Sequence, residues 1–175
     1  MGVESVPARP SKAPALLLGA ALLVLTTTLP YLTLINAFLF AGIIAAGSVA
    51  AWYYIMHNQI RLESGEAFVL GAMSGFAGGA LSVLAAYLLE KWFGYIPGLE
   101  SLQFLVAWAS RLAPEEAPNF QQMLAIVTEP KEIALTDLLM SMLLTGMFYA
   151  PFSGLGGRLT VFVLKRQARK SAGGK

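Results

Sequence analysis

A run without formal charge, from residue 13 to residue 60, constrains this chain more than any other feature of its sequence. One membrane-crossing helix needs about 20 apolar residues, so the run is long enough for two such helices and a tight turn. The composition agrees, because 57% of the 175 residues are hydrophobic and only 13% are charged. A soluble domain carries about 25% charged residues. We therefore expect an all-α integral membrane protein.

Breaks in the apolar pattern predict a four-helix bundle that forms one membrane domain over residues 14–165. Its expected spans are 14–29, 33–56, 66–89 and 136–157. Pro30 separates the first two, because proline removes a backbone donor and disfavours helix at the residue before it. Between the third and fourth spans, residues 90–135 are polar but carry apolar side chains at helical spacing. This pattern predicts short amphipathic helices that lie on the membrane surface or cap the bundle.

Four residues predict local detail. Ser64 and Thr136 are expected to cap the third and fourth helices, since serine and threonine accept hydrogen bonds at the start of a helix. Pro151 is expected to kink the fourth helix. Asn36, the only amide within a predicted span, is expected to bond carbonyl groups that Pro30 leaves without a donor.

The distribution of lysine and arginine predicts the orientation, because cytoplasmic segments of inner-membrane proteins are rich in both. Nine of the twelve basic residues fall on one predicted side: Arg9, Lys12, Arg61, Arg158, Lys165, Arg166, Arg169, Lys170 and Lys175. The other side holds Lys91, Arg111 and Lys131 and is rich in glutamate. We therefore expect the tails, 1–13 and 166–175, to be both cytoplasmic.

The third span contains the stretch GAMSGFAGGALS, which is unusually rich in glycine. Each glycine costs a helix about 1 kcal/mol relative to alanine, but small side chains let two membrane helices approach closely and gain packing. On a helical wheel these glycines, together with Ser74 and Ser82, share one face of about 140°. We therefore predict that helix packing uses Gly71, Gly75, Gly78 and Gly79 of this span, with Gly42, Gly47 and Gly146 of its neighbours. Self-association through the same face is the alternative.

The residue inventory offers little chemistry. The chain has no cysteine and one histidine, His57, whereas a metal site needs several ligands. We interpret His57 as a polar helix end; ligation of haem or chlorophyll is the alternative. Ser74 in AMSG is only superficially similar to the serine of intramembrane proteases, and SGLGGR, at 153–158, lacks the GxxxxGK[ST] pattern of a phosphate loop. We predict no catalytic residue, cofactor or metal, and the net charge of +2 does not indicate nucleic acid.

The layout resembles a family of small bacterial inner-membrane proteins known only as a domain of unknown function. The resemblance rests on the tight first hairpin, on SGEAFxxG at 64–71, on PFSG at 151–154 and on the basic end. It implies a four-span fold and an inner-membrane location, and it implies no activity or catalytic residue.

Two functions remain open at this point. No charged residue falls in the middle of a span, and transporters usually need one there. We therefore expect a non-enzymatic accessory or scaffold subunit, with the lipid bilayer and other membrane subunits, or itself, as partners. The alternative is a component of an oligomeric transporter or channel.

Overall fold

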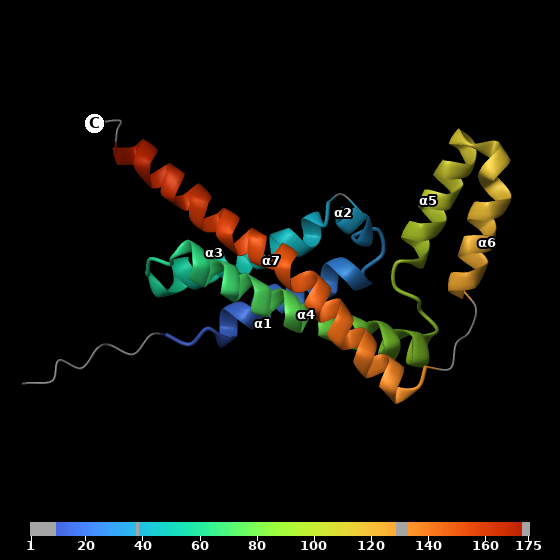
Figure 1. Cartoon of the computed structure of the whole chain (residues 1–175), viewed down its shortest axis with the longest axis horizontal. Helices are drawn as coiled ribbons and strands as arrows, with labels where there is room; N and C mark the ends of the chain where they lie inside the picture. Colours follow the sequence, from blue (N-terminus) through green and yellow to red (C-terminus); the bar gives the residue numbers. More distant parts are fainter. Residues whose placement is uncertain (1–9, 38, 129–132, 173–175) are drawn as a thin grey trace, which may run out of the picture.

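The computed structural model describes residues 10–37, 39–128 and 133–172, and all regular structure in these ranges is helical. Four helices form a bundle, and two others form a hairpin beside it (Figure 1). The elements are α1 (Ala13–Thr28), α2 (Thr33–Ala37), α3 (Ala41–Asn58), α4 (Ser64–Phe93), α5 (Leu99–Leu112), the 3-10 turn η1 (Pro114–Glu116), α6 (Ala117–Thr128) and α7 (Leu135–Ala172). Most of the predicted tail 1–13 and the last three residues of the tail 166–175 lie outside the described ranges.

Two of the described helices are long and apolar enough to cross a membrane, α4 over Ser64–Phe93 and α7 over Leu135–Lys170. They coincide with the third and fourth predicted spans. Helix α1 is apolar but has 16 residues, and α3 has 18 residues and ends in the polar pair His57-Asn58. The all-helical fold is therefore confirmed, whereas the four-span crossing of a membrane remains a prediction.

The second predicted span, 33–56, is not one helix. It is divided into α2 and α3 at Leu39 and Phe40, whose φ angles of 52° and 57° lie in the left-handed region. Tertiary packing accounts for this conformation, because it brings the Phe40 ring to within 4.5 Å of the Phe152 ring on α7, measured between centroids. No glycine or proline marks the break, which is why the local sequence does not predict it.

Both long helices begin or end differently from the prediction. The N-cap of α4 is Glu63 and not Ser64, because Glu63 forms a reciprocal capping box with Glu66. Helix α7 begins at Leu135, which places Thr136 inside it, and it continues without interruption through Pro151 to Ala172. Most of the predicted basic tail is therefore an extension of the helix that also forms the fourth span.

The end of α1 is held by side chains from α2 and from the segment after α4. Pro30 has no N–H to offer the Thr26 carbonyl, and Asn36 Nδ2 donates to that oxygen at 3.2 Å, as predicted. The Tyr95 hydroxyl, just after α4, donates to the Thr28 carbonyl at 3.1 Å. Carbonyl groups at a helix end must find such partners, so these bonds fix α2 and the base of the α5–α6 hairpin against α1.

Helices α5 and α6 lie side by side and extend away from the bundle (Figure 1). They match the predicted amphipathic helices of 90–135, but they do not cover the end of the bundle. A hydrogen bond between the hydroxyls of Thr33 and Ser101 joins the base of this hairpin to α2. The large apolar side chains that the hairpin leaves exposed are Phe104, Leu105, Trp108, Leu112, Met123, Ile126 and Val127.

Tyr95→Phe tests the attachment of the hairpin. Removing the hydroxyl leaves the Thr28 carbonyl without this donor, which costs about 0.5–1.5 kcal/mol. We expect faster amide hydrogen exchange in residues 94–101, measured by mass spectrometry in detergent. Tyr87→Phe is the matched control, because the Tyr87 hydroxyl accepts a bond from the exposed Lys91 amine and joins no second helix within the described ranges. Equal exchange in both variants would contradict the attachment.

The same bond predicts a dependence on pH. Burial, and then the neighbouring Glu100 carboxylate, raise the pKa of Tyr95 above its ordinary value of 10.0. The neutral phenol is the donor, so its stabilising contribution is complete below pH 10.0 and is lost as the pH rises through the raised pKa. We expect the difference in unfolding midpoint between the wild type and Tyr95→Phe, measured in detergent, to stay constant up to pH 10.0 and to shrink above it.

Candidate functional site

Helix α7 crosses α3 and α4 at Ser153, where three backbones come together. Ser153 is fully buried. A Cβ atom added to Gly47 on α3, or to Gly71 on α4, would overlap the carbonyl oxygen of Ser153, and one added to Gly75 would overlap the Ser153 Cβ. We call these four residues the Ser153 crossing. Only glycine lets helices approach so closely at these positions.

The other predicted glycines of α4 serve two neighbouring helices. A Cβ on Gly79 would lie 3.0 Å from the Gly146 Cα on α7, and a Cβ on Gly146 would lie 2.8 Å from the Phe76 carbonyl oxygen on α4. Gly78 instead faces α1, where a Cβ would lie 3.0 Å from the Ala20 Cα. The glycine face of α4 therefore packs against α7 along one edge and against α1 along the other.

Gly42 occupies a different setting from the other predicted glycines. A Cβ there would meet the side chain of Asn36 in α2, with the Asn36 Cγ at 3.1 Å, and the Thr26 Cβ at 3.3 Å. Gly42 thus makes room for the amide that bonds the end of α1, and its nearest neighbours are not in α4 or α7.

Three further glycines pack as closely, although the sequence analysis did not assign them this role. A Cβ on Gly156 would overlap the Ile44 carbonyl oxygen, one on Gly157 would overlap the Ala67 carbonyl oxygen, and one on Gly19 would overlap the Ser74 hydroxyl. Gly156 and Gly157 belong to the segment compared above with a phosphate loop. The helical spacing that continues to Leu164 was the signal that this segment is a helix face.

Side-chain hydroxyl groups add polar contacts between α3 and α7. Ser48 Oγ lies 2.9 Å from the Gly156 carbonyl oxygen, and Thr160 Oγ1 donates to the Ser48 carbonyl at 3.1 Å. Apart from Tyr54, whose hydroxyl donates to the Pro10 carbonyl, the buried hydrogen-bonding side chains in the described part of the chain belong to serine and threonine: Thr26, Thr28, Ser74, Ser82, Ser101 and Ser153. Hydroxyl groups can donate to helix carbonyls without placing a charge in the core.

The residues considered for chemistry are not brought together. His57 is exposed at the end of α3 and stacks on Tyr53, with ring centroids 5.2 Å apart. No group of three or more acidic or histidine side chains within the described ranges could hold a metal ion. Ser74 is buried between α1 and α4, and its hydroxyl lies 3.4 Å from the Leu16 carbonyl oxygen. Residues 153–158 lie within α7, so they form no phosphate-binding loop.

Comparison with protein-family models, curated proteins and solved structures gave no match for this chain. The resemblance to a bacterial membrane family therefore remains a prediction, and the function must be argued from the geometry of this chain.

Gly47→Ala tests the Ser153 crossing directly. The added methyl group would meet a backbone carbonyl, which cannot rotate away, so α3 and α7 must separate. Overpacking of this kind costs about 1–3 kcal/mol, more than the gain of about 1 kcal/mol in helix propensity. We expect a clear fall in the thermal unfolding midpoint in detergent.

Gly65→Ala is the matched control, because a Cβ there meets nothing within 4 Å in the first turn of α4. It should leave the midpoint unchanged or raise it. Gly75→Leu places a larger group against Ser153 and should lower the midpoint further than Gly47→Ala. Unchanged midpoints for both Gly47→Ala and Gly75→Leu would refute the close crossing.

Proposed function

We propose that this chain is an integral membrane protein of four spans, formed by α1, by α2 with α3, by α4 and by α7, and that it acts as a non-enzymatic scaffold or accessory subunit. The observation that carries the membrane placement is the exposure of α7. Within an apolar stretch of 18 residues in this helix, only 22% is buried inside the protein. The core helix of a soluble protein would be mostly covered.

The arrangement of side chains around the bundle supports the same placement. Small residues and hydroxyls face inward, and large apolar side chains face outward, as is typical of helices that pack in lipid. A soluble monomer rarely exposes so large an apolar surface. The exposed positions on α4 and α7 include Val69, Met73, Phe76, Leu139, Met140, Leu144, Met147, Phe148, Leu155, Leu159 and Phe162.

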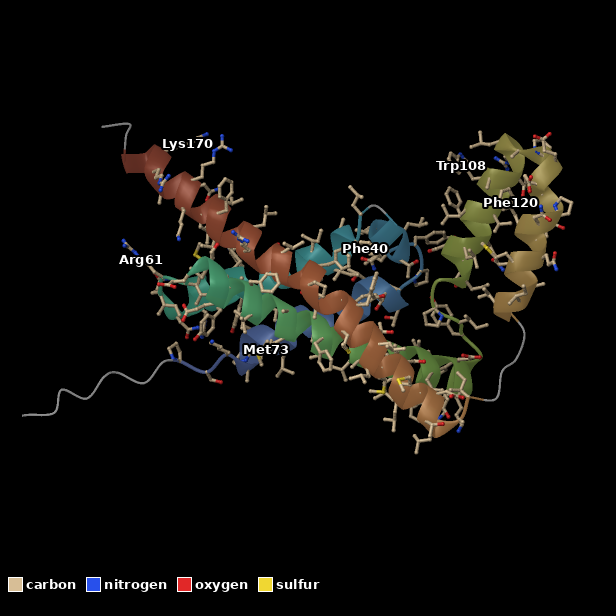
Figure 2. The ribbon with its side chains drawn as sticks, viewed as in Figure 1. Phe40, Arg61, Met73, Trp108, Phe120 and Lys170 are labelled. Atoms are coloured by element: carbon tan, nitrogen blue, oxygen red, sulfur yellow. The ribbon has the colours of Figure 1, made fainter. Side chains whose placement is uncertain are left out.

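The charges support an orientation with both ends in the cytoplasm of a bacterial cell. Lys12, Arg61, Lys165 and Arg169 line adjoining grooves at one end of the bundle. Figure 2 places Arg61 and Lys170 toward this end, with Trp108 and Phe120 of the hairpin far from both. Basic residues concentrate on the cytoplasmic side of membrane proteins, so the hairpin would face the outside.

The scaffold role rests on the contrast between the bundle and the hairpin. The glycine faces of the bundle pack against other helices of the same chain. On α5, by contrast, Phe104, Trp108 and Leu112 recur every four residues and form an exposed apolar stripe. A partner subunit that covers this stripe would bury it at the outer membrane surface. We therefore place the principal contact with other subunits on the hairpin.

Single cysteines test the topology, because the chain has none of its own. We expect Gln121→Cys, in the hairpin, to react with a membrane-impermeant maleimide on intact spheroplasts. Gln59→Cys, between α3 and α4, and Gln167→Cys, near the end of α7, should react only after the membrane is opened. Labelling of Gln59→Cys and Gln121→Cys from the same side would contradict the four-span arrangement.

Co-purification tests the scaffold role. We expect the tagged chain, extracted from its native membrane in mild detergent, to retain a second protein in fixed stoichiometry. Phe104→Glu with Trp108→Glu should release that protein, since the two charges interrupt the apolar stripe. Gln103→Glu with Ala107→Glu, the same charge change at exposed positions beside the stripe, should retain it. A solitary chain would contradict a scaffold, and ion flux through liposomes holding the chain alone would favour the channel alternative.

A further inference from the structure

A groove lies between the α3–α4 connection and the last turns of α7, at the end of the bundle marked by Arg61 in Figure 2. Its volume is about 370 Å³. Its lining has two parts: an apolar floor of Ile55, Ile60, Leu62, Val161, Leu164 and Ala168, and a basic rim of Arg61, Lys165 and Arg169.

Local structure explains how these two parts meet. Gln59 ends α3 in the left-handed region, with a φ of 53°, and the chain then turns so that Leu62 is buried while Arg61 stays exposed. On α7, Val161, Lys165 and Arg169 recur every four residues, which places them on one side of the helix. Val161 is buried at the inner end of this row, and the two bases extend beyond it.

The rim concentrates positive charge that the groove itself does not neutralise. None of the described residues that line it is acidic. A second groove, lined by Phe162, Lys165, Arg166 and Arg169, continues the basic surface around α7. A third, beside Arg61, adds Lys12 and also Glu66, whose carboxylate accepts the Glu63 N–H in the capping box of α4. Cations that line the same groove repel one another, and an anion bound between them relieves that repulsion.

We propose that this groove binds one anionic phospholipid, with its phosphate against Arg61, Lys165 and Arg169 and an acyl chain along the apolar floor. Arginine binds phosphate oxygens through paired N–H groups, and lysine adds a point charge. A free phosphate ion would use the rim alone, whereas the floor matches a hydrocarbon chain. The proposal rests on the membrane placement above, which puts this end of α3 and α7 at the level of the cytoplasmic headgroups.

Native mass spectrometry of the full-length chain in a neutral detergent tests the groove. Phosphatidylglycerol is titrated against phosphatidylcholine with the same acyl chains, and inorganic phosphate is titrated separately. We expect one molecule of phosphatidylglycerol to bind at least tenfold more tightly than phosphatidylcholine, with no retention of inorganic phosphate at the same concentrations. Equal binding of the two lipids, or retention of inorganic phosphate as tight as that of phosphatidylglycerol, would overturn the assignment.

Two pairs of substitutions locate the binding. Each basic residue near an anionic headgroup contributes about fivefold in affinity, so Lys165→Gln with Arg169→Gln should weaken phosphatidylglycerol binding by more than tenfold. Arg158→Gln with Lys170→Gln removes the same charge from α7 outside the groove and should weaken it less than threefold. Equal losses of affinity in the two double variants would show a diffuse attraction of the lipid to α7 and would overturn the assignment of the groove as the binding site.

Extraction of membranes with carbonate distinguishes a failure of the lipid proposal from a failure of the membrane placement. We expect both double variants and the wild type to stay in the membrane pellet, with equal unfolding midpoints in detergent. Wild-type chain in the pellet without selective lipid binding would overturn the groove and leave the four-span placement standing. Release of the wild type by carbonate would overturn the placement, and the lipid proposal with it.

Discussion

The bundle depends on the approach of the α7 backbone to α3 and α4 at Ser153. At Gly47 and Gly71 the neighbouring atom is the Ser153 carbonyl oxygen, and at Gly75 it is the Ser153 Cβ. In the proposed membrane placement, the hydrophobic effect provides little attraction between helices, so dispersion contacts and hydrogen bonds must hold them together. Dispersion falls steeply with distance, which makes the close crossing the main stabilising contact of the fold. The hydroxyl bonds of Ser48, next to Gly47, and of Thr160 act on two of the same helices, α3 and α7.

This requirement explains how side chains are distributed. Glycine, alanine and serine occupy the helix crossings because anything larger there would separate the backbones. Leu23, Ile43, Tyr54 and Leu70 fill the interior between the crossings, and most other large apolar residues are left for the outside. Asn36 and Tyr95 then bond carbonyls at the end of α1, where the chain leaves the helix. The Asn36 bond joins α1 to the helix that follows it, and the Tyr95 bond joins α1 to a segment far away in the sequence. The fold is therefore stabilised by close backbone approach at its centre and by bonded helix ends at its periphery.

The need for close helix packing also explains which parts of the fold could be predicted from the sequence. The four glycines of α4 were recognisable because they recur on one face of one helix, and Asn36 because Pro30 leaves a specific carbonyl without its donor. The break at Leu39 and Phe40 was not, since it depends on the contact of Phe40 with Phe152 across the bundle. The membrane span 136–157 is shorter than α7, because the charged residues that follow it end the apolar stretch without ending the helix. In this bundle Pro151 is accommodated within α7, and the glycines that follow it lie against α3 and α4.

The contacts of each glycine also determine whether a larger residue at that position could be compensated by a second substitution at the residue that it meets. Gly154 faces the Phe68 ring, with the nearest ring atom 2.8 Å from an added Cβ. A smaller side chain at Phe68 would restore that space. Gly47, Gly71, Gly156 and Gly157 face carbonyl oxygens instead, and no side-chain replacement moves a carbonyl oxygen of an intact helix. At these positions the backbone itself defines the distance between helices, so the register of α7 against α3 and α4 tolerates no compensating change. The same rigid register holds Val161 inside the bundle and carries Lys165 and Arg169 past the α3–α4 connection, where they face Arg61.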